Sequence, residues 1–250
     1  NNRLDSADWE QRTRAVATFD TRQQTQYGTL RTYLLMGFQQ DTTAGGPSTS
    51  PAVYITRGFI QIAGFTFGKA TSFYDFFPRA ALAYHAGSIF AADTGDGGQI
   101  VAGYTAQLGN GVSASIAAQH SDRNSTVNTS QNNAFTLGGA PVPQNLGSAG
   151  VTTANTGNPD VVANIRVDGA WGAFQLAGVL HDASGGYYTT AATSGGVDQA
   201  GHPSNKWGWG ISPGIRINTP FIAAGDYFVA VASWTQGASR FAASGNSNSK

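Results

Sequence analysis

Residues 15–38, AVATFDTRQQTQYGTLRTYLLMGF, contain two alternating runs separated by a polar stretch. In the second run Leu34, Met36 and Phe38 share one parity, and Arg31 falls on the other. Successive side chains of a strand point to opposite faces, so this stretch predicts strands with one apolar face and one charged face. The fold therefore depends on which face contacts water.

The same alternation recurs along the chain. In residues 98–108, for example, Ile100 and Tyr104 oppose Gln99 and Gln107. The segments with a period of two are 11–20, 28–39, 53–62, 66–70, 98–108, 112–121, 160–170, 173–183, 207–218 and 226–236. We expect these ten segments to form strands of an antiparallel sheet.

The connections between these segments alternate in length. The short ones are 21–27, 63–65, Asn110–Gly111, Trp171–Gly172 and 219–225, and the long ones are 41–51, 71–97, 122–159 and 184–206. Asn-Gly between alternating runs is a strong signal for a tight hairpin. The short-long order places all tight turns at one end of the sheet, as in an up-and-down meander.

Composition excludes several classes of function. The 14 basic and 14 acidic residues give a net charge of 0, so we expect no nucleic-acid partner. Cysteine is absent, and the four histidines show no spacing typical of a metal site. We therefore expect no metal and no cofactor.

Strand length favours a membrane protein over a soluble one. Strands of soluble sheets usually have about five or six residues, whereas a strand that crosses a bilayer needs about 9–11. Aromatic residues near the ends of the runs fit the interfacial girdles of such a barrel: Phe19, Phe38, Tyr54, Phe65, Tyr104, Trp171, Phe174, Trp207 and Phe221. We expect an all-β fold, a transmembrane antiparallel up-and-down β-barrel. The alternative is a soluble β-sandwich or surface adhesin.

Three stretches carry a family resemblance: FDTRQQTQYGTLRTYLLMGF, TRGFIQIAGFTFGKATSFYDFF and GYTAQLGNGVSASI. They resemble the outer-membrane porins of alphaproteobacteria, which include the major porins of Brucella and rhizobia. The resemblance implies homotrimers of sixteen-stranded barrels in outer-membrane lipid, which let small hydrophilic solutes and ions diffuse passively and catalyse no reaction. We accordingly expect residues 1–250 to form a single barrel domain that is incomplete at both ends.

The resemblance also implies that the long loop 71–97 folds into the barrel and constricts the pore. Its aromatic residues Phe73, Phe76, Phe77, Tyr84 and Phe90 suit an enclosed loop better than an exposed one. The candidate constriction residues are Arg12, Arg14, Arg31 and Arg57 on the strands, and Asp75, Arg79, Asp93 and Asp96 on the loop. Charged side chains at a constriction set the ion preference of a pore.

Interpretations of these residues that involve no role in the pore stay open. The arginines could simply pair with carboxylates such as Asp20, and Asp93 and Asp96 could be turn formers. An outer-membrane barrel enzyme, such as a lipase or protease, is a further alternative, but it would need a Ser/His or Asp/His grouping that the sequence does not suggest.

Overall fold

The computed structural model describes residues 12–43, 46–47, 52–76, 98–120, 135–137, 140–142, 158–184 and 204–242. The first strands are β1 (Arg12–Thr25), β2 (Gly28–Thr43), β3 (Gly46–Pro47), β4 (Ala52–Ile62), β5 (Phe65–Ala70), β6 (Gln99–Gly109) and β7 (Val112–Gln119). The later ones are β8 (Phe135–Leu137), β9 (Ala140–Val142), β10 (Asp160–Gly169), β11 (Gly172–Asp182), β12 (Trp207–Asn218), β13 (Tyr227–Val231) and β14 (Trp234–Gln236). A short 3-10 helix, η3, covers Ser239–Phe241.

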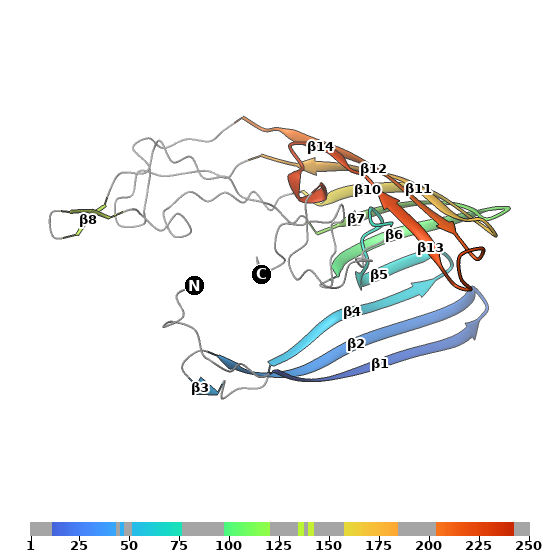
Figure 1. The fold of residues 1–250 in the computed structure, drawn as a ribbon, viewed down its shortest axis with the longest axis horizontal. Coiled ribbons are helices and arrows are strands. Elements are labelled where there is room, and N and C mark those ends of the chain that lie inside the picture. Colours follow the sequence, from blue (N-terminus) through green and yellow to red (C-terminus); the bar gives the residue numbers. More distant parts are fainter. Residues whose placement is uncertain are drawn as a thin grey trace.

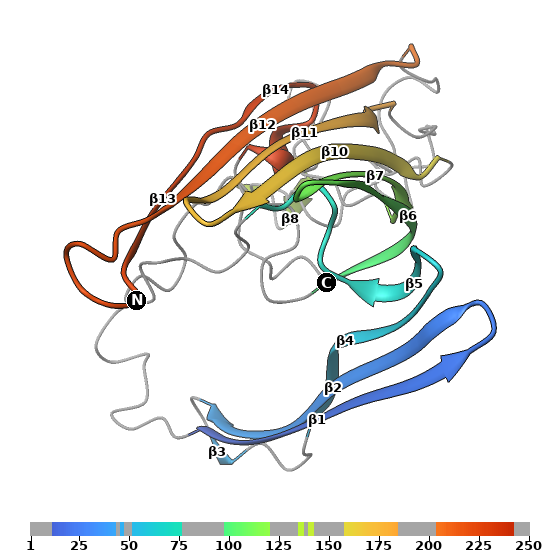
Figure 2. The ribbon, with the colours of Figure 1, turned by 90° about the vertical axis from the view of Figure 1, so that its right-hand side faces the viewer.

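The main sheet has the strand order β1-β2-β4-β5-β6-β7-β10-β11-β12-β13, with β14 beside β12 and β3 beside β2. Each described pairing is antiparallel, so the predicted up-and-down arrangement is confirmed. The sheet curves into a trough whose edges are β1 and β13 (Figure 1, Figure 2).

All ten predicted segments contain strands, but three of them differ from the structure. The strand β2 continues to Thr43, into the expected connection 41–51. The expected connection at 21–27 is mostly strand, because β1 continues to Thr25 and pairs with β2 along its whole length. The Thr21 and Thr32 hydroxyls hydrogen-bond across this extension at 2.5 Å. The last segment, 226–236, is divided into β13 and β14.

The tight turns gather at one end of the trough (Figure 1). Asn110 and Gly111 both have positive φ, 50° and 78°, as the Asn-Gly signal requires. A Cβ on Gly111 would lie 2.0 Å from the Asp168 carbonyl oxygen, so this turn also needs glycine for space. The local sequence thus fixes both the conformation and the close contact with the neighbouring hairpin.

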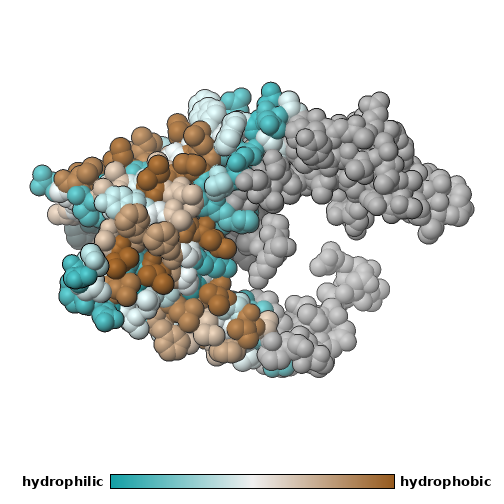
Figure 3. All heavy atoms as spheres, turned by 180° about the vertical axis from the view of Figure 1, so that it is seen from behind, coloured by the Kyte–Doolittle hydropathy of each residue, from teal (hydrophilic) through white to brown (hydrophobic). Residues whose placement is uncertain are grey.

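The two faces of the sheet are reversed relative to a soluble protein. Ile100 and Ile116 on the outer face are 62% and 56% exposed, whereas Gln99 and Gln119 on the inner face are 4% and 2% exposed. Figure 3 shows apolar side chains spread over the convex face. Among the aromatic residues expected at the interfaces, Tyr54 instead lies on the inner face, where its ring packs over Gly37.

The buried apolar cluster lies inside the trough. Residues 71–76 and 238–242 pack on the inner face of β10, β11 and β12. The cluster comprises Tyr74, Val162, Ala177, Val179, Ala238 and Phe241. The Tyr74 and Phe241 rings meet edge to face with their centroids 5.0 Å apart. Within the described ranges, no helix has the length and apolar character needed to cross a bilayer.

Candidate functional site

Arg31 lies on the inner wall formed by β1, β2 and β4, where three side-chain hydrogen bonds fix its guanidinium group. Its Nε and Nη2 donate to the two carboxylate oxygens of Asp20 at 2.9 and 3.0 Å, and its Nη1 donates to Gln61 Oε1 at 3.2 Å. Arg22, opposite Arg31 in the β1–β2 register, reaches the same carboxylate at 3.3 Å. One carboxylate therefore serves two guanidinium groups, which leaves a net positive charge at this point of the wall.

An aromatic pair lies beside these charges. The Tyr33 and Phe59 rings stack across β2 and β4 with centroids 5.1 Å apart. The Arg31 guanidinium lies 5.2 Å from the Tyr33 centroid and 5.5 Å from that of Phe59. A cation over aromatic rings is stabilised by their quadrupoles, so the rings restrain the orientation of Arg31.

Arg14 and Arg57 extend the positive wall along the same strands. Arg14 donates from Nε to Gln39 Oε1 at 2.7 Å, and its guanidinium lies 5.8 Å from the Tyr54 ring centroid. Arg57 donates from Nη1 to the Thr56 carbonyl oxygen at 2.7 Å. Both side chains are thus held against the wall by polar partners.

Residues 71–76 are attached to the opposite wall by side-chain amides and hydroxyls. Ser72 Oγ donates to Gln119 Oε1 at 2.6 Å, and Gln175 Nε2 donates to the Tyr74 carbonyl oxygen at 3.2 Å. Asn164 donates in the same way to the carbonyl oxygen of Phe73. Polar residues of the inner face therefore satisfy the backbone of this segment and hold it inside the trough.

The opposite wall carries its own charges. Arg166 pairs with Asp168 through two contacts of 2.7 and 2.9 Å, and its guanidinium lies 5.3 Å from the Phe76 ring centroid. Arg216 lies on β12 in the same row, since Asp168 pairs with Ala173 and Ala173 pairs with Arg216. These three residues were not among the predicted site residues, although their polar parity was a signal that could have identified them.

The structure brings three of the eight predicted site residues together. Arg14, Arg31 and Arg57 line the inner face of adjacent strands, and Asp75 lies buried on the segment 71–76. The backbone of Arg12 belongs to β1, but its side chain lies outside the described part, as do Arg79, Asp93 and Asp96 entirely. Arg31 also pairs with Asp20, the carboxylate that was named from the sequence as a partner.

A buried His–Asp pair lies at the loop end of β10 and β11. His181 Nδ1 and Asp160 Oδ1 are 2.7 Å apart, and both side chains are almost fully buried. Across the part of the chain that the structure describes, no three His, Asp or Glu side chains are grouped as a metal site would require. The sequence did not suggest this Asp–His grouping, which is buried within the packed layer of the trough.

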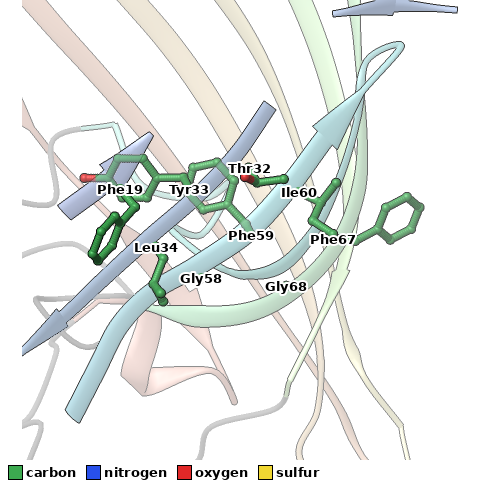
Figure 4. A pocket seen from close by; sticks show the side chains of 9 residues that line it. All are labelled: Phe19, Thr32, Tyr33, Leu34, Gly58, Phe59, Ile60, Phe67 and Gly68. Atoms are coloured by element: carbon green, nitrogen blue, oxygen red, sulfur yellow. The ribbon is translucent and has the colours of Figure 1, made fainter. Parts of the chain in front are cut away.

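The outer face has a hollow of about 570 Å³ over β1, β2, β4 and β5. Phe19, Leu34, Ile60 and Phe67 surround it, and Gly58 leaves space between them (Figure 4). Its lining is apolar, in contrast to the charged inner wall of the same strands.

The comparisons with known proteins agree with this geometry. A family model described as the porin subfamily matches residues 1–249. The fold is similar to that of the outer membrane channel DcaP of Acinetobacter baumannii, with a TM-score of 0.50 and 13% identity over 90% of this chain. The chain spans 62% of the length of that channel. No curated protein sequence matches the chain. The chain belongs to the porin subfamily, and its place is the bacterial outer membrane.

Proposed function

We propose that the protein is a passive diffusion channel for small hydrophilic solutes and ions. One observation carries this proposal: the exposed face of the sheet is apolar and the enclosed face is polar. In a membrane barrel the apolar face contacts lipid and the polar face lines an aqueous interior. No bond is made or broken in such a passage, so we infer a channel and not an enzyme.

Selectivity would arise where the inner wall faces the inward segment. Arg14, Arg31 and Arg57 supply positive charge on β1, β2 and β4, and Arg12 precedes them on β1. We propose that residues 71–97 narrow the passage, with Asp75, Arg79, Asp93 and Asp96 as its charged groups. The burial of residues 72 and 74–76 against the opposite wall supports an inward course for the start of this segment.

Two finer points belong to the same proposal. The sequence motifs favour a general porin of the alphaproteobacterial type, with outer-membrane lipid as its surroundings. We also propose that it forms homotrimers, as that resemblance implies. A chain with both edges of its sheet exposed in lipid would leave backbone groups unpaired, so the channel requires closure of the ring.

The test is conductance of the full-length protein in planar lipid bilayers. We expect stepwise increases of current, in groups of three for a trimer, and swelling of liposomes in small sugars. A protein that stays monodisperse in buffer without detergent and conducts no current would be a soluble sandwich or adhesin, and the proposal would fail.

A further inference from the structure

The strand β4 contains a β-bulge where it pairs with the middle of β2. Leu35 pairs with Arg57 and Met36 pairs with Ile55, so Thr56 has no counterpart on β2. A bulge leaves the extra residue outside the regular ladder and redirects nearby side chains. The bulge therefore determines where Arg57 points.

Two cationic side chains donate hydrogen bonds to backbone carbonyl oxygens of this bulge. Arg57 Nη1 donates to Thr56 O at 2.7 Å, and Lys69 Nζ donates to Ile55 O at 2.9 Å. The strand β5 pairs with β4 only across Gly58–Ile62, so the bulge lies beyond the reach of the β5 ladder. Arg57 and Lys69 thus satisfy the backbone carbonyl oxygens that the bulge leaves outside the ladder.

Gly98 packs tightly against this bulge. It has φ of +72°, and a Cβ on it would lie 2.4 Å from Thr56 O, 2.7 Å from Arg57 Nη1 and 3.3 Å from Lys69 Cγ. Gly98 immediately follows residues 71–97 in the chain, and the beginning of that stretch is attached to the opposite wall at Asn164 and Gln175. Ala70 and Gln99, which lie on either side of Thr71 and Gly98, are paired in the β5–β6 ladder, so the stretch leaves and rejoins the sheet at adjacent strands.

We propose that Arg57 and Lys69 form a seat for Gly98 that fixes the entry of the chain into β6 against the bulge of β4. This inference rests on the proposed channel function. Arg57 is then a positioning residue, and its planar guanidinium matters through its shape as well as its charge. A lysine at the same position keeps the charge but lacks the rigid fork of donors.

The first test uses two glycine variants with matched backbone strain. Gly98 and Gly109 both have positive φ, +72° and +91°, but a Cβ on Gly109 would meet nothing within 4 Å. We expect Gly98→Ala to change the mean single-channel conductance by about twofold and to broaden its distribution, because the narrowest part of a pore controls passage. Gly109→Ala should conduct like the unaltered protein. Equal conductance of both variants and the unaltered channel would overturn the seat.

The second test separates geometry from charge and applies even if Gly98→Ala does not fold. Arg57→Lys and Arg57→Gln are compared for conductance and for reversal potential in a salt gradient. If Arg57 is a positioning residue, both variants alter the conductance distribution alike, and Arg57→Lys leaves the reversal potential unchanged. If lysine restores the unaltered conductance, Arg57 acts by charge alone and the inference fails. Absence of current from the unaltered protein would instead refute the proposed function.

Discussion

Asp20 is the residue that most directly controls the charge of the β1–β2–β4 wall. Its carboxylate accepts two bonds from Arg31 and one from Arg22. The Arg22 side chain is 64% exposed and the Asp20 side chain 32%, so both lie near the aqueous interior. Replacing this one carboxylate therefore leaves two guanidinium groups without their shared counter-charge.

We predict that Asp20→Asn shifts the reversal potential in a salt gradient toward anion preference. Because the ion pair is exposed, its loss should change the stability of the fold little. The double variant Asp20→Asn with Arg31→Gln is the matched control, because it restores the net charge of the wall. If the single and double variants have the same reversal potential, this wall does not set ion preference.

The alternation of the sequence placed Arg14, Arg31 and Arg57 on the correct face because parity is a local property. The partners of these arginines depend on register, which alternation alone does not specify. The pairing of Arg31 with Gln61, for instance, depends on the register of β2 and β4, which a bulge shifts. The identity of a face was predictable, and the contacts across it were not.

At the scale of elements, the attachment of residues 71–76 is the feature that most changes the interior. Asn164 and Gln175 lie 91 and 101 residues from the backbone carbonyls they bind. The aromatic content of this segment suggested that it is enclosed. No local sequence pattern, however, identifies hydrogen-bond partners that lie so far away in the sequence. Each such hydrogen bond contributes about 1 kcal/mol.

We predict that Asn164→Ala and Gln175→Ala together increase open-channel current fluctuation, because the segment loses two of its attachments. Asn218→Ala is the control, since Asn218 Nδ2 donates to the Ala170 carbonyl oxygen at 3.0 Å, remote from this segment. The control removes one hydrogen bond instead of two, so it should lose less stability, and it should not change the current. Identical current records for the double variant and the control would show that these amides do not restrain the segment.

At the scale of the whole molecule, the decisive question is what surrounds the convex face. Ile116 and Ser115 are neighbours on β7 that point to opposite sides, with Ile116 56% exposed outward. Ser115 faces inward, where its hydroxyl lies 3.0 Å from that of Thr105. An arginine at either position tests the surroundings of one face.

We predict that Ile116→Arg destabilises the folded protein in phospholipid bilayers by about 2–4 kcal/mol, because it places a charge against hydrocarbon. Ser115→Arg should cost about 1 kcal/mol or less, since only one hydroxyl hydrogen bond is lost and the new charge meets water. Urea titration of the protein refolded into vesicles measures both. A soluble sheet would show the opposite order, because an exposed isoleucine in water tolerates arginine and an enclosed serine does not. That opposite order would show that the convex face does not contact lipid. The inference of an aqueous interior, on which the channel depends, would then be wrong as well.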